Sequence, residues 1–75
     1  MVTLRIDAGR TDKLRPGDIV GALTGEAGLH KDAIGKIDVF ATRSYVAIAR
    51  GQADRALQRL REGKIKGRRF RIARF

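Results

Sequence analysis

The 75 residues allow one small domain with a single core, and we expect residues 1–75 to form it. Without cysteine, the chain has neither disulfide bonds nor thiolate-bound zinc, and no apolar run approaches the roughly 20 residues of a membrane span. Seventeen Lys and Arg against eight Asp and Glu give a net charge of +9, which points to a polyanionic partner.

The first half of the chain predicts a strand, a basic loop and a helix. Apolar and polar residues alternate over residues 2–7, which is the period of a half-buried strand. A basic loop is expected over residues 9–13. Pro16 suits the first turn of a helix, because its missing N–H needs no partner there, and the glycine-rich residues 25–28 end that helix.

The second half predicts two strands, a second helix and a last strand. Alternation over residues 36–39 and 45–49 predicts the two strands. Apolar residues spaced by three and four predict a helix from Gln52 onwards, and Gly63 is expected to form its left-handed cap. A further alternation predicts the last strand over residues 69–74.

The resulting order, β-α-β-β-α-β, is that of the ferredoxin-like split βαβ fold of the α+β class. In this fold two helices cover one face of a four-stranded antiparallel sheet. The opposite face is expected to be open, basic and nearly free of bulky apolar groups. It would present Thr3, Arg5, Lys36, Asp38, Tyr45, Ala47, Arg69 and Arg71.

No arrangement of residues indicates catalysis or a metal site. The single histidine, His30, has no cysteine or second histidine as a partner and is expected to be a solvated loop residue. The carboxylates are scattered, and the glycines lack the following Lys-Ser/Thr of a phosphate-binding loop. We therefore expect a non-enzymatic domain that uses no cofactor and no metal.

Basic residues gather in the last fifth of the chain. Residues 61–75 hold seven Lys or Arg against a single acidic residue, Glu62. This asymmetry favours a phosphate-contacting surface over an ordinary solvated face. The residues expected to contact phosphates are Lys64, Lys66, Arg68, Arg69 and Arg71, together with Arg10, Lys13 and Arg15.

The third strand partly matches the signature of an RNA-recognition motif (RRM). Within residues 43–50, Arg43, Tyr45 and Ile48 fit the signature, but four other positions do not. On the first strand, Arg5 occupies the place of the usual second stacking aromatic. Tyr45, Arg5, Lys36 and the hydroxyl of Ser44 are expected to face bases, and Arg43 is expected to contact RNA as well.

Five stretches of the chain resemble the C-terminal RNA-binding domain of the DbpA/CsdA group of DEAD-box RNA helicases. They are residues 3–9, 13–23, 34–39, 44–48 and 64–68, which together span almost the whole chain in the family's order. Residues 34–37 and 64–67 are the most specific, whereas Ala8 stands where members often have a second glycine.

The resemblance implies an atypical RRM that targets an ATP-dependent helicase to structured ribosomal RNA, a large-subunit hairpin, during ribosome assembly. It also implies a cytoplasmic parent chain whose helicase core precedes this domain, so residues 1–75 would be a module excised from it. We expect a monomer without a membrane partner.

The alternative is a ferredoxin-like module that docks an acidic protein partner through the same basic face. The ratio of specific to non-specific nucleic-acid affinity would separate the two.

Overall fold

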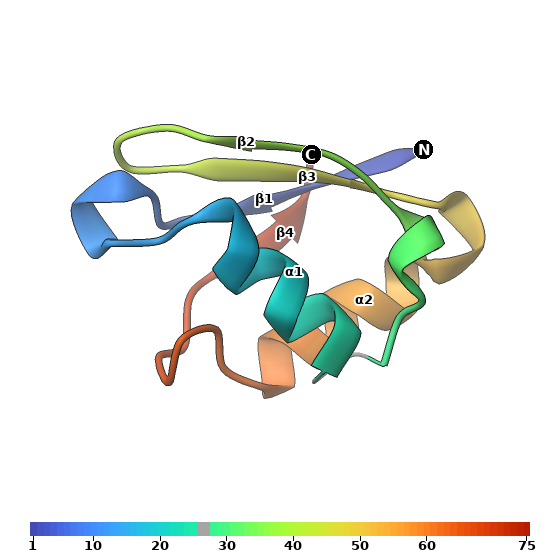
Figure 1. Cartoon of the computed structure of the whole chain (residues 1–75). Coiled ribbons are helices and arrows are strands. Elements are labelled where there is room, and N and C mark those ends of the chain that lie inside the picture. Colours follow the sequence, from blue (N-terminus) through green and yellow to red (C-terminus); the bar gives the residue numbers. More distant parts are fainter. Residues whose placement is uncertain (26–27) are drawn as a thin grey trace.

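The computed structural model describes residues 1–25 and 28–75 and confirms the ferredoxin-like arrangement. Both helices lie on one face of a four-stranded antiparallel sheet (Figure 1), whose strand order is β2-β3-β1-β4. The strands are β1 (Val2–Ile6), β2 (Ile34–Val39), β3 (Ser44–Ile48) and β4 (Ile72–Arg74). The helices are α1 (Pro16–Gly25) and α2 (Arg50–Glu62), and two 3₁₀ turns are η1 (Arg10–Asp12) and η2 (Lys31–Ala33). No helix in the described ranges is long and apolar enough to cross a membrane.

The apolar side of the sheet and the two helices form the core. The central strands β1 and β3 pair antiparallel, with Leu4 opposite Val46 and Val2 opposite Ile48. Full burial of a large aliphatic side chain contributes about 1.5–3 kcal/mol, so this layer supplies most of the stability. Its fully buried members from strands and helices include Leu4, Ile6, Val46, Ile48, Ile19, Leu23, Ala53, Ala56 and Leu60.

Helix α1 begins at Pro16, as the sequence predicts. The Asp18 carboxylate accepts the backbone N–H of Arg15 at 3.0 Å, next to the first turn. A negative charge here also complements the N-terminal end of the helix dipole. These two features fix where the basic loop ends and the helix starts.

The left-handed residues after α2 lie further along the chain than expected. Gly63 is extended (φ −95°, ψ −162°), so the predicted left-handed cap at this position is wrong. Positive φ angles occur instead at Lys66 (54°) and Gly67 (74°). These two residues form a tight hairpin turn in which Ile65 and Arg68 exchange backbone hydrogen bonds of 2.8 and 3.0 Å. Because Ile65 is buried, this hairpin is anchored to the core.

Strand β4 is shorter than the alternation predicts. It begins at Ile72, where pairing with β1 starts, rather than at residue 69. Arg69 lies before the strand, and its guanidinium donates to the carbonyl oxygen of Glu62 at 3.4 Å. The expectation that Arg69 lies on the open sheet face is therefore wrong. Arg71 also precedes the strand, although its carbonyl accepts the N–H of Asp7 at 2.9 Å.

Ser44 belongs to the core rather than to the open face. It pairs with Ile6 across β1 and β3, and its side chain is fully buried. Its hydroxyl donates to the carbonyl oxygen of Ala8 at 2.7 Å. The expectation that this hydroxyl faces RNA is therefore corrected, because the strand period turns residue 44 inward.

Replacing Ser44 by Ala should lower the free energy of unfolding by about 1–3 kcal/mol, because the buried Ala8 carbonyl loses its donor. RNA affinity of the folded variant should stay unchanged. Urea unfolding followed by circular dichroism measures the first quantity. Thr11→Ala is the matched control, since that exposed hydroxyl also donates to a carbonyl, of Ala41, at 2.9 Å. The control should lose less than about 1 kcal/mol; equal losses would contradict the structural role of Ser44.

Candidate nucleic-acid interface

The basic loop that follows β1 packs tightly against the turn between β2 and β3. The N–H of Arg10 donates to the carbonyl of Phe40 at 2.8 Å, and the N–H of Thr11 donates to that of Ala41 at 2.9 Å. A Cβ atom at Gly9 would overlap the Phe40 carbonyl oxygen, so only glycine permits this approach. Figure 1 shows the loop and the turn at the same end of the sheet.

Asp12 fixes the same loop from inside. Its carboxylate accepts the N–H of Gly9 at 3.0 Å and lies 3.8 Å from the guanidinium of Arg68. Lys13 then turns the chain towards α1 in a left-handed conformation, with φ of 61°. The loop is thereby held to the sheet on one side and to the hairpin on the other.

Four predicted phosphate-binding residues from two distant parts of the chain meet around one hollow of about 330 Å³. We call it the basic hollow; its lining residues are Arg10, Lys13, Leu14, Arg15 and Lys66. The Lys66 ammonium donates to the Lys13 carbonyl at 2.8 Å and lies 3.7 Å from the Asp18 carboxylate. The fold therefore gathers positive charge that the sequence distributes over more than 50 positions.

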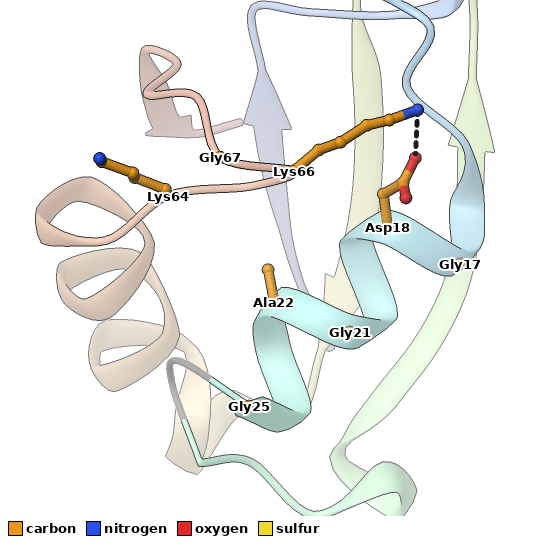
Figure 2. A pocket seen from close by; sticks show the side chains of 8 residues that line it. All are labelled: Gly17, Asp18, Gly21, Ala22, Gly25, Lys64, Lys66 and Gly67. Carbon is orange, nitrogen blue, oxygen red and sulfur yellow. Dashed lines mark ion pairs between the residues drawn. The ribbon is translucent and has the colours of Figure 1, made fainter.

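A larger groove, of about 770 Å³, lies beside the basic hollow, between α1 and the hairpin (Figure 2). Lys66 reaches across it to Asp18 at the start of α1, whereas Lys64 points away from α1. Of the two lysines, only Lys66 therefore joins the basic hollow. The groove is lined by Gly17, Asp18, Gly21, Ala22, Gly25, Lys64, Lys66 and Gly67.

The arginines after the hairpin diverge. Arg68 pairs with Asp12, and its guanidinium lies over the ring of Phe70, 5.1 Å from the centroid. Arg69 is turned towards the end of α2, and Arg71 is exposed just before β4. The basic residues predicted to contact phosphates over residues 64–71 therefore do not all line the basic hollow.

A carboxylate lies near each of three basic residues that were expected to contact RNA: Arg5, Lys36 and Arg43. The Nε atoms of Arg5 and Arg43 lie 3.3 and 4.0 Å from Asp7, and the Lys36 ammonium lies 3.6 Å from Asp38. Arg43 and Lys36 stay largely exposed. An exposed pair of this kind contributes less than about 1 kcal/mol, so phosphates can compete with the carboxylates.

Two phenylalanines that sequence reasoning missed join Tyr45 on the open face. The ring centroids of Phe40 and Phe75 lie 5.9 and 5.0 Å from that of Tyr45, both edge to face. We call these three residues the aromatic cluster. Phe40 is 54% exposed and Phe75 77%, so the expectation of a face nearly free of bulky apolar groups is wrong. The alternation of side chains along a strand could have predicted both positions. Phe40 follows Asp38 by two residues and Phe75 follows Ala73 by two, so each continues the open-face side of its strand.

The single histidine has a local structural role. His30 is exposed, and its Nδ1 atom accepts the N–H of Asp32 at 3.3 Å at the start of η2. Over residues 1–25 and 28–75, no cluster of three His, Asp or Glu side chains could hold a metal ion.

Replacing Gly9 by Ala should lower the free energy of unfolding by about 1–3 kcal/mol, because the added methyl group overlaps the Phe40 carbonyl oxygen. Gly21→Ala is the matched control, since a Cβ there meets nothing within 4 Å. The control should raise stability by up to about 1 kcal/mol, because alanine is the better helix former. Urea unfolding measures both, and shifts of the same sign would contradict the close approach at Gly9.

Known proteins match almost the whole length of the chain. Residues 3–74 match the family described as "DbpA RNA binding domain". The chain is 49% identical over 72 residues to "ATP-dependent RNA helicase DbpA" of Escherichia coli (strain K12), covering 96% of this chain and 16% of that protein. It is 35% identical over 68 residues to "ATP-dependent RNA helicase DeaD" of Buchnera aphidicola subsp. Schizaphis graminum (strain Sg), covering 91% and 11%. The chain thus spans about one sixth or less of these relatives, and it belongs to the DbpA RNA-binding domain family.

Proposed function

We propose that this domain binds structured ribosomal RNA and directs a DEAD-box helicase to it. The observation that carries the proposal is the basic hollow, where Arg10, Lys13 and Arg15 meet Lys66 from the far end of the chain. Membership of the DbpA RNA-binding domain family supports RNA as the polyanion. The net charge of +9 favours association with RNA over association with neutral surfaces.

In this proposal the basic hollow binds phosphates and sets the orientation of the RNA. Each Lys or Arg that neutralises a phosphate releases counterions, so affinity falls as salt rises. Such contacts carry no sequence information by themselves. Discrimination between RNAs would then come from shape and from bases that reach the sheet face.

The rigidity of the basic loop favours a folded RNA as the partner. Gly9 and Asp12 hold the loop backbone before any RNA arrives, so the Cα positions of its basic residues have fixed spacing. A preorganised surface loses little conformational entropy on binding. It also discriminates against chains whose phosphates do not match that spacing, which is recognition by shape.

Catalysis would belong to another part of the parent protein. The named relatives are ATP-dependent RNA helicases of which this chain spans only a fraction. We propose that residues 1–75 are the targeting module of such an enzyme. The module would act as a monomer on a large-subunit ribosomal RNA hairpin during ribosome assembly in the cytoplasm.

The first test titrates the domain against a fluorescent large-subunit ribosomal hairpin and against a scrambled hairpin of equal length. Each titration is run at low and at moderate salt. The proposal expects binding of the ribosomal hairpin to persist at moderate salt while binding of the scrambled one is lost. If the two hairpins bind equally and both lose binding as the salt concentration rises, the targeting role is overturned and an acidic protein is favoured as the partner.

A charge-matched pair of double variants tests the basic hollow. Arg10→Gln with Arg15→Gln should reduce the slope of log K against log salt by about 1.4–1.8, because two phosphate contacts are lost. Arg55→Gln with Arg59→Gln removes the same charge from the exposed side of α2 and should change the slope far less. Equal slopes for both pairs would mean that only total charge matters.

A further inference from the structure

We propose that Asp18 is a positioning residue for RNA recognition: it holds the ammonium of Lys66 at the basic hollow and thereby raises the preference for the structured RNA over other polyanions. This inference rests on the proposed function and deepens it, because it names a residue that sets discrimination between RNAs. Although a carboxylate repels phosphates, removal of this one should weaken binding of the specific RNA.

The start of α1 fixes the orientation of the Asp18 carboxylate. Its Oδ2 atom accepts the N–H of Arg15 at 3.0 Å, and Arg15 directly precedes the first residue of the helix, Pro16. A side chain at the third helical position commonly reaches back to the backbone in this way. The Asp18 side chain is only 27% exposed. Its direction is therefore set by the helix start before any RNA binds.

The Lys66 ammonium lies between two anchors that belong to the other end of the chain. It lies 3.7 Å from the same Oδ2 atom of Asp18 (Figure 2) and donates to the carbonyl oxygen of Lys13 at 2.8 Å. Within residues 1–25 and 28–75 these are the partners of this ammonium. A lysine ammonium carries three donors, so one donor remains for a phosphate oxygen at the hollow.

The backbone is also unusual on both sides of this contact. Of the described residues other than glycine, Lys13 and Lys66 are the two with a positive φ, at 61° and 54°. Left-handed backbone is uncommon for residues with a side chain, and where it occurs it gathers at functional sites. Here both left-handed residues are the two partners of one hydrogen bond. The fold thus keeps an unfavourable conformation at the point where it places the ammonium.

A fixed ammonium favours one arrangement of phosphates over others. A phosphate that matches its position is bound with little further loss of conformational entropy. The negative charge of Asp18 meanwhile repels phosphates that approach in other positions. Because specificity is a difference between affinities, an unfavourable contact for the wrong partner contributes to it. Asp18 should therefore strengthen binding of the matching RNA and weaken binding of unmatched RNA.

The experiment measures the affinity of Asp18→Asn for the ribosomal hairpin and for the scrambled hairpin at the same salt concentration. The amide oxygen of asparagine can still accept the N–H of Arg15, so the helix start is kept. Binding of the ribosomal hairpin should weaken about five-fold, because Lys66 loses an anchor. Binding of the scrambled hairpin should stay the same or strengthen up to about two-fold, because the net positive charge rises by one.

Asp54→Asn is the matched control. The Asp54 carboxylate also pairs with a cation, Arg74, at 3.3 Å, but neither residue lines the basic hollow. This variant raises the net charge by the same amount. It should therefore change the affinities for both hairpins by one common factor and leave their ratio unaltered.

A double-mutant cycle shows whether Asp18 acts through Lys66. Lys66→Asn removes the ammonium and keeps the turn, because Asn-Gly is the preferred sequence for a two-residue hairpin loop with positive φ at both positions. In this background Asp18→Asn should no longer weaken binding of the ribosomal hairpin. Thermal unfolding followed by circular dichroism verifies that each variant folds.

Three outcomes would overturn the inference, and they are distinguishable. If Asp18→Asn changes both hairpins by one common factor, as the control does, Asp18 acts only through its charge and the proposed function stands. If Asp18→Asn still weakens binding about five-fold without Lys66, the residue acts through α1 instead. If the unaltered domain binds the two hairpins equally, the proposed function fails and the inference fails with it.

Discussion

At Gly9 the backbone that leaves β1 passes so close to the carbonyl oxygen of Phe40 that no side chain fits between them. Two backbone hydrogen bonds, from Arg10 and Thr11 to the β2–β3 turn, depend on that approach. The basic loop therefore moves as one piece with the sheet. The position of the loop's basic residues relative to the sheet therefore depends on this junction.

The hairpin after α2 completes the same arrangement from the other end of the chain. Ile65 is buried, which anchors the hairpin, while Lys66 and Arg68 extend from it to Asp18 and Asp12. These carboxylates hold the cations in place, where unopposed positive charges would repel one another. Acidic residues within a strongly basic domain thus organise the surface on which phosphates are expected.

Strand and helix periods were enough to predict the element order and the core face, and Pro16 predicted the start of α1. The same period could have placed Ser44 inside and Phe40 on the open face, since both follow the alternation of their strands. It could not have predicted the shape of the hairpin, because left-handed backbone at Lys66 depends on how the buried Ile65 fits the core. Long-range pairings such as Lys66 with Lys13 are set by tertiary packing alone.

The glycines of α1 lower the local stability of this helix. Gly17, Gly21 and Gly25 lie in one short helix, and a Cβ at any of them would meet nothing within 4 Å. Each glycine inside a helix costs about 1 kcal/mol relative to alanine, so α1 is held mainly by the burial of Ile19 and Leu23. Its amide protons should exchange with solvent sooner than those of α2, which buries alanines along its core face. Helix α1, which forms one wall of the groove, should therefore unfold locally more readily than α2.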